Sequence, residues 1–233
     1  MATRIINHQS IELNWLNPIQ IEEPKTLVLG SFNPYDPCNN EDWVDYYYGR
    51  RANFFWPSIA YNINPVHPRD YFYLNLGLKQ SIMDNHFCCL DVINSIEINC
   101  QDKTALDQFI DNNIYSGFSD RILFRTNTEY NNHRIKVIRH YNQSIIDFLQ
   151  NTTTITKVIH TMGNNRIPNR NGINPGENQF GVDGFNGFMN TIIDICGERN
   201  FLFESYSPSA YAVHSGRTNE VTLRNWLRVN LFL

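Results

Sequence analysis

The chain has 233 residues, of which 42% are hydrophobic and 18% are charged, with a formal net charge of −4 and a pI of about 6.0. This hydrophobic content suffices for a core and excludes disorder of the whole chain, and the length predicts one domain spanning residues 1–233. The acidic balance disfavours a protein that coats bulk duplex DNA, because basic faces supply most non-specific affinity, but it is compatible with a local basic groove.

The sequence predicts a cytoplasmic protein without disulfides. The amino-terminal segment MATRIINHQSIELNW lacks a long apolar run, and no stretch approaches the roughly 18 apolar residues of a membrane span. The five cysteines include no C-x-x-C pair. His86, Cys88, Cys89 and Cys100 could be combined as metal ligands, but their spacing suits one tetrahedral ion poorly, and buried thiols are the expected alternative.

Strands and helices are predicted to alternate along the chain. In chain order, the patterns first predict a buried strand at 26–32 (TLVLGSF), a helix within 53–63 with Pro57 in its first turn, and an ordered apolar segment at 87–98. They then predict a short helix and a strand pair within 107–126, an amphipathic helix at 142–152 and a second central strand at 154–164 (TITKVIHTMGN). The last predicted elements are a helix at 187–199 with Gly197 as its C-cap, a third buried strand at 200–210 (NFLFESYSPSA) and a helix at 219–232.

Repeated strand–loop–helix units indicate an α/β fold, in the form of a three-layer α/β/α sandwich with a short, mainly parallel central sheet. Ligands of such folds bind at the carboxyl ends of the strands, here after Phe32, Met162 and Tyr206. The Asn/Gly-rich insertion at 163–187 is interpreted either as a surface loop or as a flap near the site.

The segment YYYGRRANFFWPSI (46–59) places Asn53 between paired arginines and a group of aromatic residues. It follows LVLGSFNP (27–34) and precedes LGLKQSIMD and LDVINS, then KVIHTMGN (157–164) and SYSPSAYAVHSG (205–216). In this order, the segments resemble the uracil-DNA glycosylase superfamily over roughly residues 24–232, and are most similar to its hypoxanthine/mismatch-type branch.

The resemblance implies a uracil-DNA glycosylase-like fold and a hydrolase of base-excision repair of DNA damage, which cleaves the N-glycosidic bond of a deaminated or damaged base. It makes Asn53 the catalytic candidate and the Ser-Pro loop an element that inserts against the DNA strand. The chain departs from the pattern after Gly30, where Ser-Phe-Asn-Pro replaces an early Pro-Gly, and at Ser205, where the family has a histidine. The literal match GINPG (172–176) follows no apolar strand and is interpreted as coincidental.

Two asparagines are the candidate catalytic residues. A glycosylase must hold the extruded base, place a water molecule and stabilise the charge of the departing base. Asn53 can orient water but cannot act as a base, and it could instead cap a helix that begins at Phe54 or Phe55. Asn33 follows the first strand, and Asn33-Pro34-Tyr35 resembles the Asp-Pro-Tyr of other uracil enzymes with an amide in place of the acid; the alternative is an Asn-Pro turn.

The remaining candidates would bind the base or the strand. Phe32, Tyr48 and Phe54 could each stack the base, worth about 1–3 kcal/mol, or pack in the core, and Asn164 could read a base edge. The candidates for DNA binding are hydroxyl, proline and basic residues: Arg50, Arg51, Ser205, Ser207, Pro208, Ser209, His214 and Arg217. Alternatively, the serines form a strand-end turn, and Arg50 and Arg51 pair with Asp42 and Asp45.

Three functions remain open from the sequence: a DNA glycosylase, a non-catalytic nucleic-acid or nucleotide-binding protein on the same fold, and a hydrolase of free or modified nucleosides. The expected partner is DNA, bound by a monomer, and no metal or other cofactor is expected. A positive stripe beside the pocket would favour DNA, whereas an acidic rim would favour small molecules.

Overall fold

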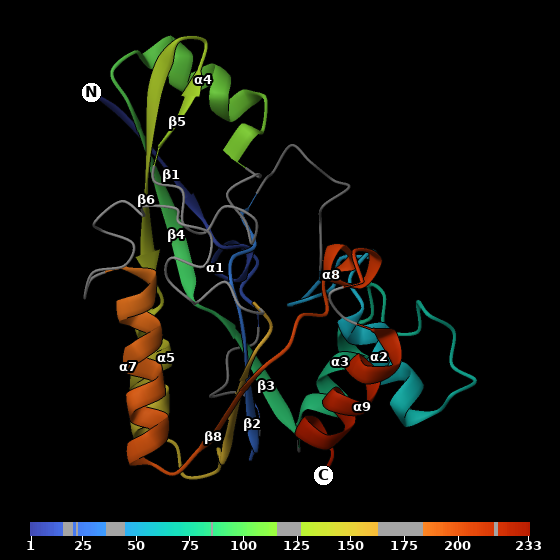
Figure 1. Ribbon diagram of the computed structural model, residues 1–233. Coiled ribbons are helices and arrows are strands. Elements are labelled where there is room, and N and C mark those ends of the chain that lie inside the picture. Colours follow the sequence, from blue (N-terminus) through green and yellow to red (C-terminus); the bar gives the residue numbers. More distant parts are fainter. Residues whose placement is uncertain are drawn as a thin grey trace.

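The computed structural model describes residues 1–15, 21, 23–35, 45–84, 86–115, 127–162, 184–216 and 219–233. It is a mixed α/β structure with two four-stranded sheets (Figure 1). One sheet is entirely parallel, in the order β3-β2-β7-β8, and is formed by β2 (Thr26–Gly30), β3 (Phe87–Asp91), β7 (Lys157–His160) and β8 (Leu202–Ser205). The predicted α/β class and the parallel sheet are therefore confirmed.

The second sheet is antiparallel and was not predicted. Its order is β1-β4-β6-β5, and its strands are β1 (Ala2–Asn7), β4 (Ile93–Cys100), β5 (Asn127–Tyr130) and β6 (His133–Tyr141). The chain passes from β3 into β4 through Val92, so one long extended segment joins the two sheets (Figure 1). In β6, Ile135, Val137 and Arg139 are buried and alternate with less buried neighbours, as in a strand with one covered face.

Burial differs among the strands of the parallel sheet. All five residues of β2 and of β3 are buried, which is why these strands are continuous apolar runs rather than alternating ones. The prediction of a third buried strand is wrong for β8: among the described strands it lies at the edge of the sheet and pairs with β7 alone, and Leu202 is 48% exposed. Edge position alone does not account for this exposure, because β3, at the opposite edge of the sheet, is entirely buried.

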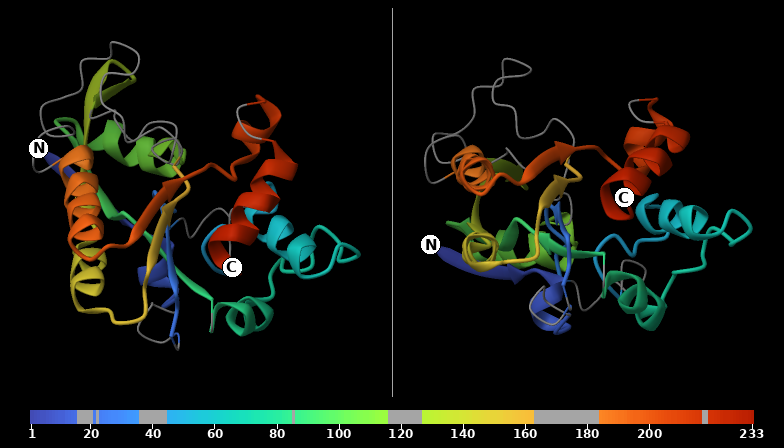
Figure 2. Two further views of the ribbon diagram at one scale, coloured as in Figure 1. Left: turned by 60° about the horizontal axis from the view of Figure 1, so that its bottom comes forward. Right: turned by 90° about the horizontal axis from the view of Figure 1, so that it is seen from below.

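Helices lie on both sides of the parallel sheet. α5 and α7 lie side by side on one side, and α2, α3 and α9 lie on the other (Figure 2). The helices of the described segments are α1 (Gln9–Glu12), α2 (Phe55–Ile63), α3 (Leu76–Met83), α4 (Lys103–Asp111), α5 (Gln143–Asn151), α7 (Phe185–Glu198), α8 (Ala210–His214) and α9 (Glu220–Leu231). None of them combines the length and the apolar composition that a membrane crossing requires.

The helix ends follow from short polar side chains. The side chains of Asn75, Asp102, Asn142 and Asn219 accept hydrogen bonds from backbone N–H groups in the first turns of α3, α4, α5 and α9. The prediction that Gly197 caps the helix at 187–199 is wrong. Gly197 lies within α7, and the left-handed position beyond the helix is taken by Asn200, with φ of 56°.

Candidate active site

A pocket of about 100 Å³ lies at the carboxyl ends of the parallel strands, and we call it the strand-end pocket. Its described lining comes from separate parts of the chain: Ser31, Phe32 and Asn33 after β2, Tyr47, Tyr48, Gly49, Arg50 and Asn53 before α2, Asp91 at the end of β3, Thr161 after β7, and Pro208 and Ser209 after β8. The structure therefore brings both predicted catalytic asparagines, two predicted stacking rings and part of the Ser-Pro loop into one site.

Asn33 is oriented by a predicted DNA-binding arginine. Arg50 Nη2 donates a hydrogen bond to Asn33 Oδ1 over 3.0 Å. Asn33 Nδ2 is buried and has no hydrogen-bond partner among the described residues. An unmet buried donor costs roughly 1–3 kcal/mol, so this amide group is suited to a ligand that offers an acceptor, such as a carbonyl oxygen.

Asn53 caps α2. Its Oδ1 accepts a hydrogen bond of 2.8 Å from the backbone N–H of Phe55, the first residue of the helix. The backbone N–H of Asn53 is bonded in turn to the carbonyl of Arg50 at 2.9 Å. The capping interpretation is therefore confirmed, and because Asn53 also lines the strand-end pocket, its amide nitrogen is the part of the side chain left for a ligand.

We expect Asn53→Ala to lower the free energy of unfolding by about 1 kcal/mol, because the Phe55 N–H loses its acceptor. Asn53→Ser should retain most of the stability, since a hydroxyl can cap the helix. Urea unfolding measures both variants, with Asn190→Ala on the exposed face of α7 as the control. An Asn53→Ala protein as stable as the wild type would contradict a capping role.

The three candidate stacking rings have different environments. Phe32 lines the strand-end pocket but is only 4% exposed, and its ring contacts His8. Tyr48 lines the same pocket, its hydroxyl lies 3.0 Å from Thr161 Oγ1, and its backbone is left-handed with φ of 59°. Phe54 is buried and is not among the described residues that line the pocket; Arg69 covers its ring at 4.1 Å.

A buried His–Asp pair borders the strand-end pocket and was missed by sequence reasoning. His8 Nε2 lies 2.7 Å from Asp91 Oδ2, and both side chains are buried. The backbone N–H of Ser10 donates to His8 Nδ1 over 3.0 Å, so Nδ1 is an acceptor and the Nε2–H group donates a hydrogen bond to the carboxylate. Because these residues are 83 positions apart and His8 lies in an unremarkable amino-terminal segment, no local sequence signal could have paired them.

The Ser-Pro loop is tied to the start of α2. The Pro208 carbonyl accepts a hydrogen bond of 3.0 Å from the N–H of Phe54. Ser209 Oγ accepts from the N–H of Ala212, in the first turn of α8, at 3.1 Å and lies 3.2 Å from Ser207 Oγ. Pro208 and Ser209 line the pocket.

The other predicted strand-binding residues are more scattered. Ser205 ends β8, and the exposed His214 ends α8 with its ring against Phe54. Asn164 and Arg217 lie outside the described residues, as does Asp42. Asp45 pairs with Lys79 instead of an arginine.

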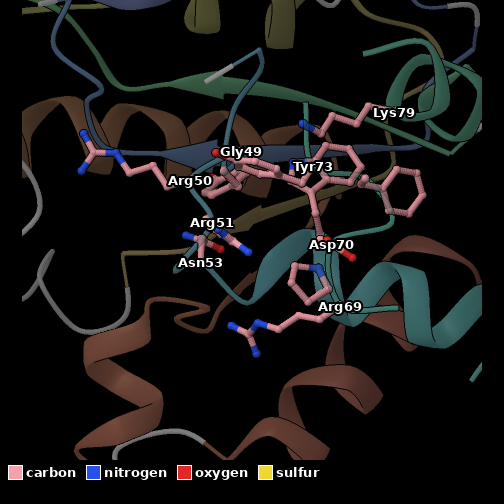
Figure 3. A pocket seen from close by; sticks show the side chains of 12 residues that line it. Gly49, Arg50, Arg51, Asn53, Arg69, Asp70, Tyr73 and Lys79 are labelled. Carbon is pink, nitrogen blue, oxygen red and sulfur yellow. The ribbon is translucent and has the colours of Figure 1, made fainter. Parts of the chain in front are cut away.

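A second cavity of about 260 Å³ adjoins the first, and we call it the arginine pocket (Figure 3). It shares Tyr48, Gly49, Arg50 and Asn53 with the strand-end pocket. The rest of its described lining is Arg51, Trp56, Pro57, Arg69, Asp70, Phe72, Tyr73 and Lys79. Lys79 is fully buried and donates to Asp45 Oδ1, and burial lowers the pKa of its ammonium group.

Nothing in the described residues indicates a metal centre. Cys88, Cys89 and Cys100 are buried free thiols, and burial raises the pKa of Cys88 and Cys89, which disfavours the thiolate form that binds metals. Within the described segments, no group of three or more His, Cys, Asp or Glu side chains is placed to hold an ion.

The fold and the site together define an α/β protein with a pocket at the carboxyl edge of a parallel sheet, the usual ligand position in such folds. Comparisons of the chain with protein-family models, with curated proteins and with solved structures gave no match. The residues of the site are therefore the basis on which its function is inferred.

Proposed function

We propose that the protein is a DNA glycosylase that releases a deaminated or damaged base of the uracil or hypoxanthine type. The observation that supports this most is the buried, unmet amide donor of Asn33 beside an aspartate carboxylate in one strand-end pocket. A parallel sheet with helices on both sides also supports the finer assignment, a uracil-DNA glycosylase-like three-layer fold.

Asn33 would recognise the base and stabilise its departure. Its Nδ2 can donate to a carbonyl oxygen of uracil or hypoxanthine, and this bond strengthens as negative charge develops on the base. Arg50, bonded to Asn33 Oδ1, keeps the amide in this orientation and adds a positive charge behind it. Phe32 and Tyr48 would form the aromatic wall of the base pocket.

Asp91 is the proposed acceptor of the water proton. Water forms a bond to C1′ while the C1′–N bond breaks, the bonding electrons leave with the base, and the water proton passes to Asp91. His8 holds Asp91 through Oδ2, which leaves Oδ1 for the water. Asn53 would help to position this water through its amide nitrogen, since its Oδ1 caps α2. The Ser207–Ser209 loop would grip the strand, and DNA is the partner.

The proposal is tested by base release from labelled oligonucleotides, single- and double-stranded, that carry uracil, hypoxanthine, xanthine or a G:T or G:U mismatch. We expect wild-type activity on at least one substrate and a loss of about 10²–10³-fold for Asn33→Ala, the typical cost of one charge-stabilising donor. Asn190→Ala should match the wild type. A loss in Asn53→Ser, which keeps the helix cap, would assign the Asn53 amide to the reaction; full activity would limit it to capping. No release from any substrate would refute the glycosylase.

A non-catalytic nucleic-acid or nucleotide-binding protein is the second candidate. One observation favours it: the acceptor oxygens of both asparagines are already engaged, Asn33 by Arg50 and Asn53 by the Phe55 N–H. In the same experiments, oligonucleotide binding that weakens steeply with salt, without base release, would support this candidate because phosphate contacts release counterions. Free nucleosides included as substrates would reveal a nucleoside hydrolase.

A further inference from the structure

The arginine pocket combines an aromatic floor with a cationic rim. Trp56 and Phe72 are buried at its floor, whereas Arg51, Arg69 and Tyr73 are exposed at its rim. A ligand that fits this lining has a flat apolar part and an anionic part.

The two rim arginines lie over aromatic rings and are not paired with a carboxylate among the described residues. Arg69 lies over the Phe54 ring at 4.1 Å, and Arg51 lies over the Tyr73 ring at 5.9 Å. Neither guanidinium forms an ion pair with any described carboxylate. Stacking on a ring fixes the plane of a guanidinium and leaves its N–H groups for an acceptor, for which phosphate oxygens are well suited.

Among the described lining residues, the remaining charges leave a net positive rim. The Lys79 ammonium is paired with Asp45, so this buried pair adds little net charge to the cavity. Arg50 extends away from the other two arginines, toward Asn33 (Figure 3). Asp70 is the acidic residue among the lining side chains, and its carboxylate can accept from an amino group or a sugar hydroxyl.

We propose that the arginine pocket is a second binding site, which takes a nucleoside 5′-phosphate. The phosphate is bound by Arg51 and Arg69, and the base enters over the aromatic floor beside Tyr73. The ligand is a free mononucleotide or the phosphorylated end of a strand, and the two share the same chemistry. A ligand in the arginine pocket would lie next to the strand-end pocket, because both pockets are lined by Tyr48, Gly49, Arg50 and Asn53.

Calorimetric titration tests this site without relying on base release. The probes are deoxyadenosine 5′-monophosphate, deoxyadenosine, inorganic phosphate, and one oligonucleotide with and without a 5′-phosphate. We expect the monophosphate or the 5′-phosphorylated oligonucleotide to bind at least roughly tenfold more tightly than its unphosphorylated counterpart, the effect of one charged hydrogen bond. Preference for the free monophosphate identifies a mononucleotide ligand, and preference for the oligonucleotide identifies a strand end.

The variants separate this site from the strand-end pocket. Arg51→Gln/Arg69→Gln should weaken binding at least roughly tenfold, whereas Arg134→Gln, an exposed arginine on β6, should not change it. Asn33→Ala should also leave it unchanged, because Asn33 is not among the described residues lining the arginine pocket. Equal binding by the double variant and the wild type, binding of inorganic phosphate as tight as that of the nucleotide, or no binding of any probe would overturn the proposal.

Discussion

Asp91→Asn should lower the rate of base release by about 10²–10⁴-fold, the usual contribution of a general base. Asparagine has nearly the same shape as aspartate, and its oxygen can still accept a hydrogen bond from the Nε2–H group of His8, so the arrangement at the end of β3 should persist. An amide cannot take up the proton that the attacking water loses. The loss should therefore lie in the chemical step, measured by single-turnover assays with enzyme in excess.

Asp111→Asn, at the exposed end of α4, is the matched control and should keep full activity. The free energy of unfolding of both variants shows whether a loss reflects damage to the fold. An Asp91→Asn protein with the wild-type rate would show that Asp91 does not take part in the reaction. The asparagines would then be the residues that position the water. An equal loss in Asp111→Asn would show that the assay does not report on the site.

Gly30→Ala should destabilise the protein by about 1–3 kcal/mol, as overpacking of a well-filled interior does. A Cβ on Gly30 would overlap Asp91 Oδ1 and lie 2.8 Å from Tyr48 Oη. Gly30 ends the central strand β2 directly opposite Asp91 in the register with β3, so the backbone cannot move away without breaking strand pairing. The displaced carboxylate would also lose its bond to His8. Urea unfolding measures the stability.

A double-mutant cycle identifies the cause. If the clash is with Asp91, the Gly30→Ala/Asp91→Ala protein should be more stable than the sum of the two single losses implies, by about 0.5–3 kcal/mol. Gly197→Ala is the control, since an added methyl group there meets nothing within 4 Å inside α7, and a gain of about 0.5–1 kcal/mol is expected. Additive losses would contradict the steric explanation.

Much of the fold could be predicted where the signal is local. A continuous apolar run identified β2, and an amphipathic pattern identified α5, because burial and the helical period act over neighbouring residues. β1 and the antiparallel sheet were missed. Strand pairing across 88 to 98 positions depends on which partner is available, and a short, partly exposed strand such as β1 carries little signal of its own.

The residues of the candidate site also differ in whether they could be predicted from the sequence. Asn33 could be selected from the sequence because it follows a recognisable strand end, and Asn53 because its segment resembles that of a known family. The sequence therefore determined the α/β class, three of the four strands of the described parallel sheet (β2, β7 and β8) and the segments that carry the pocket, whereas β3 was expected only as an ordered apolar segment. Tertiary structure alone decided the hydrogen bond of Arg50 to Asn33, the pairing of His8 with Asp91 and the use of Gly30 beside that carboxylate. These contacts join distant segments, and the geometry of a buried hydrogen bond is set by the packing of whole elements and not by the residues on either side of it.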